Sequence, residues 1–276
     1  MRKPSWLDKK IDLEALAEVQ RLVKGLRLHT VCEEAKCPNI GECFRSRTAT
    51  FLLLGDRCTR DCRFCAVKPG EPRAPDETEP QRVAQAVRRL GLDFVVLTSV
   101  CRDDLVDKGL WAFVETIEEI RKNSPRIHIE TLVPDFAGRR GLIARLAASA
   151  PDIISHNLET VSDLYSSCRP QASYRRSLDL LRLIKAADKD LRTKSGIMLG
   201  LGESRHQVIE VFRDLREAGC DRLSIGQYLA PSSSHLEVKE YIPPEAFRSY
   251  EHLALEMGFE QVVSSPYART SYRGGS

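Results

Sequence analysis

Six of the nine cysteines lie between Cys32 and Cys65, and their spacing is the feature of this sequence best suited to chemistry. The later three form the run Cys58-Thr-Arg-Asp-Cys62-Arg-Phe-Cys65, a C-x3-C-x2-C pattern. Thiolates on so short a loop can bind three irons of a [4Fe–4S] cube, whereas a complete set has four cysteines. The fourth iron would then keep an open position for a small molecule.

Zinc is the alternative occupant of this triplet. Structural zinc sites use four ligands, often in two C-x2-4-C or H-x3-5-H pairs. Here a fourth ligand would have to come from elsewhere, and His29, the nearest histidine in sequence, does not stand at zinc-finger spacing. The pattern therefore favours an iron–sulfur cluster. The three scattered cysteines are predicted not to be ligands: Cys101, Cys168 and Cys220.

The C-x3-C-x2-C run, with the aromatic Phe64 before its last cysteine, resembles the signature of the radical S-adenosylmethionine (SAM) superfamily. The resemblance implies that the open iron chelates the amino and carboxylate groups of the methionine part of SAM. It also implies that an electron from the cluster breaks a carbon–sulfur bond and releases a 5′-deoxyadenosyl radical. Four cations beside the run are interpreted either as a solvated loop or as groups that raise the cluster potential and steer an acidic partner: Arg57, Arg60, Arg63 and Lys68.

The earlier triplet of Cys32, Cys37 and Cys43 has C-x4-C-x5-C spacing and ends fifteen residues before Cys58. Together the two triplets make the stretch 30–67 resemble the lipoyl synthase family, including the flanking Cys-Pro-Asn and Gly-Glu-Cys. That resemblance implies a second, auxiliary [4Fe–4S] cluster on the earlier triplet.

The end of the chain carries the next part of the resemblance. In the lipoyl synthase family the fourth ligand of the auxiliary cluster is a serine in an Arg-Ser-Ser-Tyr motif, and this chain reads Arg269-Thr270-Ser271-Tyr272. Threonine replaces the first serine, while the implied ligand is present as Ser271. Without the resemblance, Ser271 would be interpreted as a solvated serine, because serine seldom binds iron.

Polar residues after the strands are expected to line the SAM pocket, because loops at the carboxyl ends of parallel strands carry the chemistry of such folds. The segment Thr98–Leu105 resembles the family's TSV-x-RDDL, with Cys101 where aspartate is usual. Cys101 is interpreted as a passive small residue, with an extra reactive thiol as the alternative. Glu159 and Arg169 are candidates for contacts to the methionine amino and carboxylate groups, since a bidentate arginine suits a carboxylate. The full expected set is Ser99, Arg102, Asn157, Glu159, Arg169, Lys194 and Gln227, the last for adenosine or ribose.

From Thr50 onward the chain alternates short apolar runs with amphipathic segments. The runs are rich in Val, Ile and Leu with little polar alternation, which is typical of parallel strands buried on both faces. Strands are predicted at 50–54, 94–100, 127–133, 152–158, 196–200 and 223–229. Helices are predicted at 80–90, 110–123, 139–148, 173–187, 205–218 and 243–257.

Six strand–helix units in series predict a parallel sheet with right-handed crossovers. An eight-unit barrel takes about 250 residues, and fewer remain after the N-terminal region. The α/β class is therefore expected as a partial (β/α)6 TIM-like barrel, with a doubly wound sheet as the alternative. The predicted parts are 1–49, with a helix at about 12–25 and the cysteine-rich auxiliary-cluster loop; 50–260, the barrel; and 261–276, a tail with the serine ligand.

The lipoyl synthase resemblance implies an enzyme that inserts sulfur at C6 and C8 of an octanoyl chain carried on a lysine, with the auxiliary cluster as sulfur donor. Those carbons are unactivated, so no side-chain base can deprotonate them near neutral pH, whereas a radical can abstract the hydrogen. The implied cofactors are two [4Fe–4S] clusters and SAM. The implied partners are octanoylated carrier domains (2-oxoacid dehydrogenase E2 subunits and glycine cleavage H protein), an electron donor such as flavodoxin or ferredoxin, and an iron–sulfur cluster carrier.

Two other classes are weighed against this interpretation. Another sulfur-inserting relative, or a radical methylthiotransferase, would share the later triplet but would not pair C-x4-C-x5-C with an Arg-x-Ser-Tyr end. A ferredoxin-like electron carrier would be small and would carry four cysteines per cluster. The length of 276 residues argues against such a carrier.

Charge and hydropathy exclude further classes. The 42 Lys and Arg against 39 Asp and Glu leave a net charge of +3, too balanced for a nucleic-acid-binding protein. No apolar run approaches the roughly 20 residues of a membrane span, and Met1–Lys10 lacks the apolar core of a secretion signal. A cytoplasmic protein is therefore expected, without nucleic-acid or membrane partners.

Overall fold

The computed structural model describes residues 3–7, 20–31, 39, 42–43 and 46–271. The chain divides into two compact units, each with its own strands and helices. The amino-terminal unit comprises Lys10–Arg60 and Ala66–Ile154; the carboxy-terminal unit comprises Met1–Lys9, Asp61–Cys65 and Ser155–Ser276. The division passes through the later cysteine triplet, so Cys58 belongs to the first unit and its two companions to the second.

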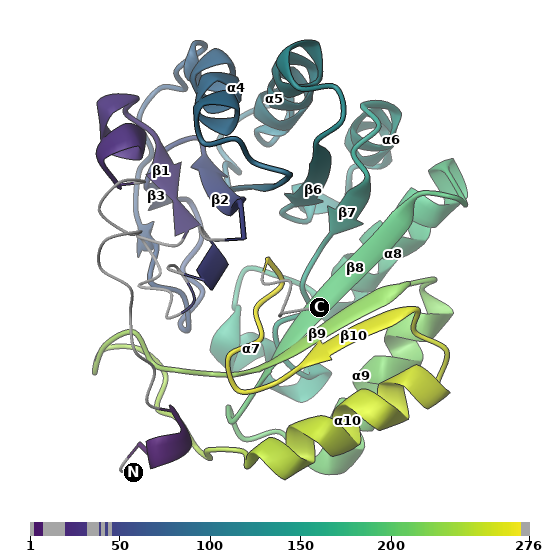
Figure 1. Ribbon diagram of the computed structural model, residues 1–276. Helices are drawn as coiled ribbons and strands as arrows, with labels where there is room; N and C mark the ends of the chain where they lie inside the picture. The colour runs from purple at the N-terminus through teal and green to yellow at the C-terminus, as the bar shows by residue number, and fades with distance from the viewer. Residues whose placement is uncertain (1–2, 8–19, 32–38, 40–41, 44–45, 272–276) are drawn as a thin grey trace. The chain divides into compact units, whose positions relative to one another are not determined.

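The amino-terminal unit is built on parallel strands that are buried on both faces (Figure 1). Strands β2 (Thr48–Leu53), β5 (Phe94–Ser99) and β6 (His128–Leu132) pair in parallel in this order. Strand β7 (Ile153–Ser155) lies next to β6. Every residue of β2 is buried, as is all of β5 except its last residue. This two-sided burial explains their unbroken apolar sequences.

Two short additions flank these strands. The two-residue β1 (His29–Thr30) pairs antiparallel with β2, and β3 (Arg57–Cys58) pairs in parallel with β4 (Lys68–Pro69). The β3–β4 pair frames the cysteine loop, because Cys58 is the last residue of β3. Residues 20–25 are helical, within the helix predicted at about 12–25, whose earlier part lies outside the described residues.

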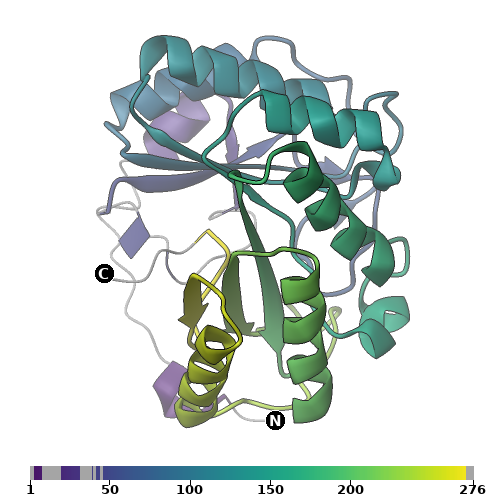
Figure 2. The same cartoon turned by 90° about the vertical axis from the view of Figure 1, so that its right-hand side faces the viewer.

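Three helices of the amino-terminal unit lie side by side over its strands (Figures 1 and 2): α4 (Glu79–Arg89), α5 (Leu110–Asn123) and α6 (Arg140–Ala148). α4 has proline in its first turn and arginines in its last, the usual punctuation of a helix. α5 follows Gly109, whose φ is 82°, and a Cβ there would stand 2.4 Å from the Leu54 side chain. Only glycine fits that close approach without a shift.

The carboxy-terminal unit repeats the scheme with parallel strands in sequential order, β8 (Arg192–Leu199), β9 (Arg222–Gln227) and β10 (Gln261–Ser264). Its helices are α7 (Tyr165–Cys168), α8 (Tyr174–Ala187), α9 (Arg205–Glu217) and α10 (Pro244–Glu256). Short 3-10 turns are η1 (Ser5–Leu7) and η3 (Ser162–Leu164) here, and η2 (Phe136–Gly138) in the other unit.

Helix starts in this unit follow local chemistry. Ser173 accepts a hydrogen bond from the Arg176 N–H, and Ser204 with Gln207 forms a complete capping box. Inside the unit, the buried Phe212 of α9 meets Tyr250 and Phe259 edge to face. These contacts join α9, α10 and the start of the β10 segment.

The six predicted strands and six predicted helices are all present, with ends shifted by a few residues, and the α/β class is confirmed. Strand order is sequential inside each unit, as in a partial barrel and unlike the reversed order of a doubly wound sheet. The structure adds β10, which lies in the segment predicted as a tail. Its four residues are too few to show a periodic pattern, and pairing with β9 creates the strand. Among the described residues, no helix is long and apolar enough to cross a membrane.

Candidate cluster and cofactor site

Cys58 is a half-buried thiol that several donors surround. Its Sγ accepts backbone hydrogen bonds from the N–H groups of Cys101 at 3.2 Å and Arg60 at 3.4 Å. A hydrogen bond with the Cys101 side chain, aided by these N–H groups and opposed by burial, lowers the pKa of Cys58 to about 6. Thiolate is the form of cysteine that binds iron. The site therefore has the chemistry that the predicted cluster needs from this residue.

Buried ion pairs hold the chain that follows Cys58. The Thr59 amide and hydroxyl both donate to the Cys101 carbonyl, at 3.1 and 2.9 Å. The Arg60 side chain is 6% exposed and contacts Asp103 at 2.6 Å and Asp135 at 2.7 Å. Burial opposes its charge, but these two carboxylates raise the pKa of Arg60. Arg60 therefore ties the cysteine loop to the loops after β5 and β6.

For Arg60, this placement rules out the interpretation as a solvated loop cation, because the side chain is buried and paired with two aspartates. An effect of Arg60 on the cluster potential stays a prediction. The other three cations are exposed: Arg57, Arg63 and Lys68. Sequence spacing gave no sign of the difference, since Asp103 and Asp135 are 43 and 75 residues away.

Cys62 and Cys65 lie in the carboxy-terminal unit, on a tight turn closed by a 2.9 Å bond from the Cys65 N–H to the Cys62 carbonyl. Both are half-buried. Between them, the Arg63 N–H donates to the Cys168 carbonyl at 2.9 Å, and Phe64 packs against an apolar cluster of that unit. Neutral hydrogen bonds and packing thus hold this half of the loop.

Within the described ranges, no three His, Cys, Asp or Glu side chains are grouped so that they could hold a metal ion. The ligand set of Cys58, Cys62 and Cys65 therefore stays a prediction, which the lowered Cys58 pKa supports. Of the earlier triplet, Cys43 is half-buried next to Glu42 in helical backbone, while Cys32 and Cys37 lie outside the described residues. The auxiliary ligand set also stays a prediction.

The segment 265–271 lies against β8 and β9 of its own unit. Thr270 Oγ1 donates to Asn157 Oδ1 at 2.8 Å, and the Thr270 carbonyl accepts from Lys194 Nζ. A Cβ at Gly196 would stand 2.5 Å from Thr270 Oγ1, and one at Gly226 would stand 2.2 Å from the Ala268 carbonyl oxygen. Two glycines on neighbouring strands thus make room for this segment.

Ser271 follows directly, half-buried in a turn. The contacts of Thr270 fix the backbone next to Ser271, so Ser271 does not lie on a fully solvated segment. Tyr272 lies outside the described residues. The role of Ser271 as an iron ligand remains a prediction.

Four of the predicted SAM-pocket residues lie in one network with this segment. Asn157 Nδ2 donates to Glu159 Oε1 at 3.0 Å, and Arg169 Nη1 donates to the Asn157 carbonyl at 2.9 Å. Lys194 joins through Thr270. Burial raises the pKa of Glu159, while Arg169 and Asn157 oppose that rise.

The backbone at Glu159 is unusual in the same place. Its φ is 69°, a left-handed conformation that few non-glycine residues adopt. Hydrogen bonds from the Glu159 N–H to the Gly196 carbonyl, and from the Met198 N–H to the Glu159 carbonyl, hold it there. Strain held in this way is frequent where a side chain must be aimed at a ligand.

The remaining predicted pocket residues differ from one another. Ser99 ends β5 with a buried hydroxyl that has no hydrogen-bond partner among the described residues. Arg102 is paired with Asp104 at 2.7 Å, while its Nη1 has no partner in the same part of the chain. These orphan donors and acceptors fit a bound polar ligand.

Gln227 is fully buried, and its amide is already engaged. Nε2 donates to the carbonyls of Leu199 and Glu240, and Oε1 accepts from the Ile242 N–H at 2.9 Å. It therefore fastens the segment after β9 to β8, and a contact with adenosine or ribose stays a prediction.

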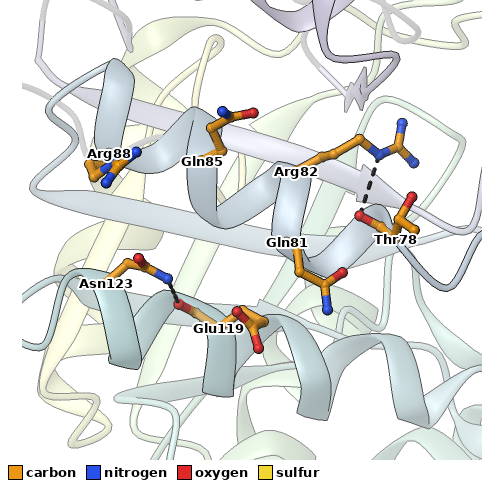
Figure 3. A pocket seen from close by; sticks show the side chains of 7 residues that line it. All are labelled: Thr78, Gln81, Arg82, Gln85, Arg88, Glu119 and Asn123. Atoms are coloured by element: carbon orange, nitrogen blue, oxygen red, sulfur yellow. Dashed lines mark hydrogen bonds between the residues drawn. The ribbon is translucent and has the colours of Figure 1, made fainter.

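Sequence reasoning missed three residues at this site. Asp103 lies in the TSV-x-RDDL-like segment without an assigned role, and Asp135 was not singled out, although both neutralise Arg60. His235 was not singled out, yet its Nε2 lies 3.1 Å from the Cys65 carbonyl oxygen. A hollow between α4 and α5, lined by residues such as Arg82 and Glu119 (Figure 3), contains none of the predicted site residues.

Comparison with known proteins places the chain. The family model of the radical SAM superfamily matches residues 52–215. A lipoyl synthase of Geobacter metallireducens is 56% identical over 272 residues, covering 99% of this chain and 96% of that protein. One from Caldanaerobacter subterraneus subsp. tengcongensis is 52% identical, covering 99% and 95%. The chain belongs to the lipoyl synthase family. As a member of that family it is a radical SAM enzyme, and SAM and a [4Fe–4S] cluster are its cofactors.

Solved structures of other proteins resemble the fold of this lipoyl synthase family member. The crystal structure of Streptococcus suis SuiB bound to precursor peptide SuiA has a TM-score of 0.60 at 14% identity, covering 96% of this chain and 57% of that one. Methylornithine synthase (PylB) has a TM-score of 0.52 at 15% identity, covering 98% and 88%. At these identities the likeness extends to the fold alone.

Proposed function

We propose that this protein inserts two sulfur atoms at C6 and C8 of an octanoyl chain attached to a lysine of a carrier domain. The observation that carries the proposal is the docked segment that ends at Ser271. Thr270 bonds Asn157 across 113 residues of sequence, in the network that contains Glu159 and Arg169. A residue implied as an auxiliary-cluster ligand is thereby held beside residues expected to bind SAM.

The later triplet is proposed to hold the cluster that binds SAM. When bound, the cluster and SAM together supply a 5′-deoxyadenosyl radical able to abstract hydrogen from an unactivated carbon. Cys58 contributes a thiolate, because its lowered pKa keeps it ionised near neutral pH. Arg60 and Thr59 hold its loop to the strand-end loops that carry Ser99 and Arg102.

The network around Glu159 is proposed to bind the methionine part of SAM. Glu159 would accept from the amino group, and Arg169 would face the carboxylate, a pairing suited to a guanidinium. Asn157 and Lys194 keep these groups in place through bonds to Glu159 and to the Thr270 backbone. Asn157, Glu159 and Arg169 are half-buried, and Lys194 and Thr270 are buried.

Cys32, Cys37, Cys43 and Ser271 are proposed to hold the auxiliary cluster, which would supply the sulfur when bound. A serine oxygen is a poorer match than thiolate for iron bound to sulfide, so Ser271 would hold its iron less firmly than a cysteine would. The contacts of Thr270 position Ser271 for this role.

Octanoylated lipoyl domains follow from the family as substrates. We propose the finer partners on the chemistry alone: E2 subunits of 2-oxoacid dehydrogenases and the glycine cleavage H protein as carriers, flavodoxin or ferredoxin as electron donor, and a cluster carrier that rebuilds the spent auxiliary site.

The test is anaerobic reconstitution followed by iron and sulfide counting and an assay on an octanoyl-lysine peptide. We expect about eight irons per chain, as two [4Fe–4S] clusters require, and lipoyl peptide as product. The triple variant with alanine at Cys58, Cys62 and Cys65 should keep one cluster and lose SAM cleavage. Zinc without iron, or SAM cleavage without sulfur insertion, would defeat the proposal.

A further inference from the structure

The segment between β9 and α10 makes direct contact with the Cys62–Cys65 turn of its own unit. The Leu236 N–H donates to the Arg63 carbonyl at 3.2 Å, and His235 Nε2 lies 3.1 Å from the Cys65 carbonyl oxygen. Thus two successive residues of this segment bind the carbonyls on either side of Phe64. Cys65 and His235 are 170 positions apart in the sequence, so their contact arises only in the folded chain.

The segment is itself well anchored. Tyr228 is 1% exposed, and its hydroxyl donates to the Leu236 carbonyl at 2.8 Å. Leu236 and Phe64 pack against one apolar cluster, whose buried members are Cys168, Leu201, Tyr228 and Val238. The Lys239 N–H donates to the Gly200 carbonyl at 2.9 Å. We call residues 232–239 the latch segment.

Chemistry settles which nitrogen of His235 carries a proton. A carbonyl oxygen only accepts, so Nε2 must donate to Cys65. Nδ1 lies 2.8 Å from Ser232 Oγ, which is able to donate to it, and neutral imidazole then satisfies both contacts. The Cys65 carbonyl therefore fixes the tautomer, and the Ser232 hydroxyl, which can donate or accept, makes the second hydrogen bond of the ring. His235 is half-buried, whereas Ser232 is exposed.

We infer that His235 is a positioning residue that holds the Cys62–Cys65 turn in its cluster-binding conformation through the latch segment. The inference rests on the proposed function for its meaning, because it assigns a role toward the predicted cluster ligands. It does not depend on a charge change at His235: the neutral ring makes both bonds. Leu236 supplies the backbone half of the latch, and Phe64 supplies the packing.

The test is hydrogen exchange of the metal-free protein, read at the amides of Arg63 and Cys65, which bond Cys168 and Cys62. His235→Leu should accelerate exchange at both amides about fivefold, the effect of losing one hydrogen bond. His235→Gln keeps a donor for the carbonyl and should stay within about twofold of the parent. Ser232→Ala, which leaves the ring but removes the hydrogen bond that orients it, should fall between.

His252→Leu is the matched control, since His252 is an exposed histidine on α10 that pairs with Glu256. It should leave the two amides unchanged. The amides of α9 are the internal reference: equal acceleration there would mean general destabilisation and would overturn the latch.

A second readout uses the loaded enzyme. His235→Leu should bind iron at the later triplet but give a lower midpoint potential than the parent, because the carbonyl of Cys65, a predicted cluster ligand, has lost its hydrogen-bond donor. His235→Gln should restore that potential. A potential unmoved by His235→Leu would contradict the role.

The two proposals fail separately. If parent and His235→Leu exchange alike at Arg63 and Cys65 while the parent binds its clusters and makes lipoyl peptide, the latch is wrong and the function stands. If the parent binds no iron after reconstitution, yet His235→Leu accelerates exchange at these amides alone, the function is wrong and the contact stands.

Discussion

The two halves of the cysteine loop are held by different physics. Around Cys58, in the amino-terminal unit, the hold is ionic, with Arg60 buried between Asp103 and Asp135. Around Cys62 and Cys65, in the carboxy-terminal unit, it is neutral, through carbonyl hydrogen bonds and the packing of Phe64. A buried ion pair is costly to break on one side, whereas neutral contacts are lost in small steps. The comparison predicts effects of different size on the two sides.

Removing the buried cation should have the largest effect. Arg60→Leu leaves Asp103 and Asp135 without their partner and should lower the free energy of unfolding by about 3 kcal/mol. Urea denaturation of the metal-free protein at pH 7 measures it. Arg57→Leu is the matched control, because Arg57 is exposed, and should change stability by less than about 0.5 kcal/mol.

The same pair has a defined pH dependence. The Arg60 hydrogen bond holds the pKa of Asp103 below its usual value. That stabilisation is fully present above the unfolded pKa near 3.9 and is lost as the pH falls through the lower folded pKa. The difference between the parent and Arg60→Leu should therefore narrow below about pH 4. A constant difference from pH 7 to pH 3 would speak against an ionic hold.

Removing the apolar anchor on the other side should cost less. Phe64→Ala deletes a partly buried ring and should lower stability by about 2 kcal/mol, below the range for a fully buried phenylalanine. Alkylation of the metal-free protein should quicken at Cys62 and Cys65 and stay unchanged at Cys58. Leu255→Ala, at a largely exposed side chain, is the control. Equal quickening at all three thiols would erase the distinction between the halves.

Ser271→Ala should leave both halves of the cysteine loop unchanged and reduce only the formation of lipoyl product. We expect 5′-deoxyadenosine formation at nearly the parental rate and lipoyl peptide reduced roughly tenfold, about 1.4 kcal/mol. Ser271→Cys should also make little product, because a thiolate holds the iron more firmly. Ser249→Ala, an exposed serine on α10, should be silent. Normal product from Ser271→Ala would leave the docked segment a structural role only.

The smallest effect is expected where the chain departs from the family's usual serine. Thr270→Ser keeps the hydroxyl that donates to Asn157 and should change stability and product by less than about 0.5 kcal/mol. Thr270→Val removes that donor and should cost about 1 kcal/mol. Thermal unfolding and product assay on the pair measure the difference. A large effect of serine itself would show that the threonine methyl matters for packing.

Local patterns in the sequence predict most of the helices and strands, and the structure confirms them. Two-sided burial leaves continuous apolar runs, and helix faces leave periodic ones, so the strands from 50 to 227 and their helices were predictable. The prediction of a cluster on Cys58, Cys62 and Cys65 also needs only local information, because the three cysteines lie within eight residues of sequence. Strand β10 was not predicted, because its four residues form a strand only by pairing with β9.

Long-range contacts, which appear only in the folded chain, select the residues that support the cysteine loop. In the sequence, Arg60 looks like its three exposed neighbours, and only the fold places Asp103 and Asp135 against it. Gln227 was expected to contact adenosine or ribose, yet its amide hydrogen-bonds to the backbone of Leu199 and Ile242. His235 had no sequence signal, because its partner is a main-chain carbonyl, which every residue carries. Composition and spacing record what a side chain is able to do, whereas burial and long-range partners select which of those abilities is used.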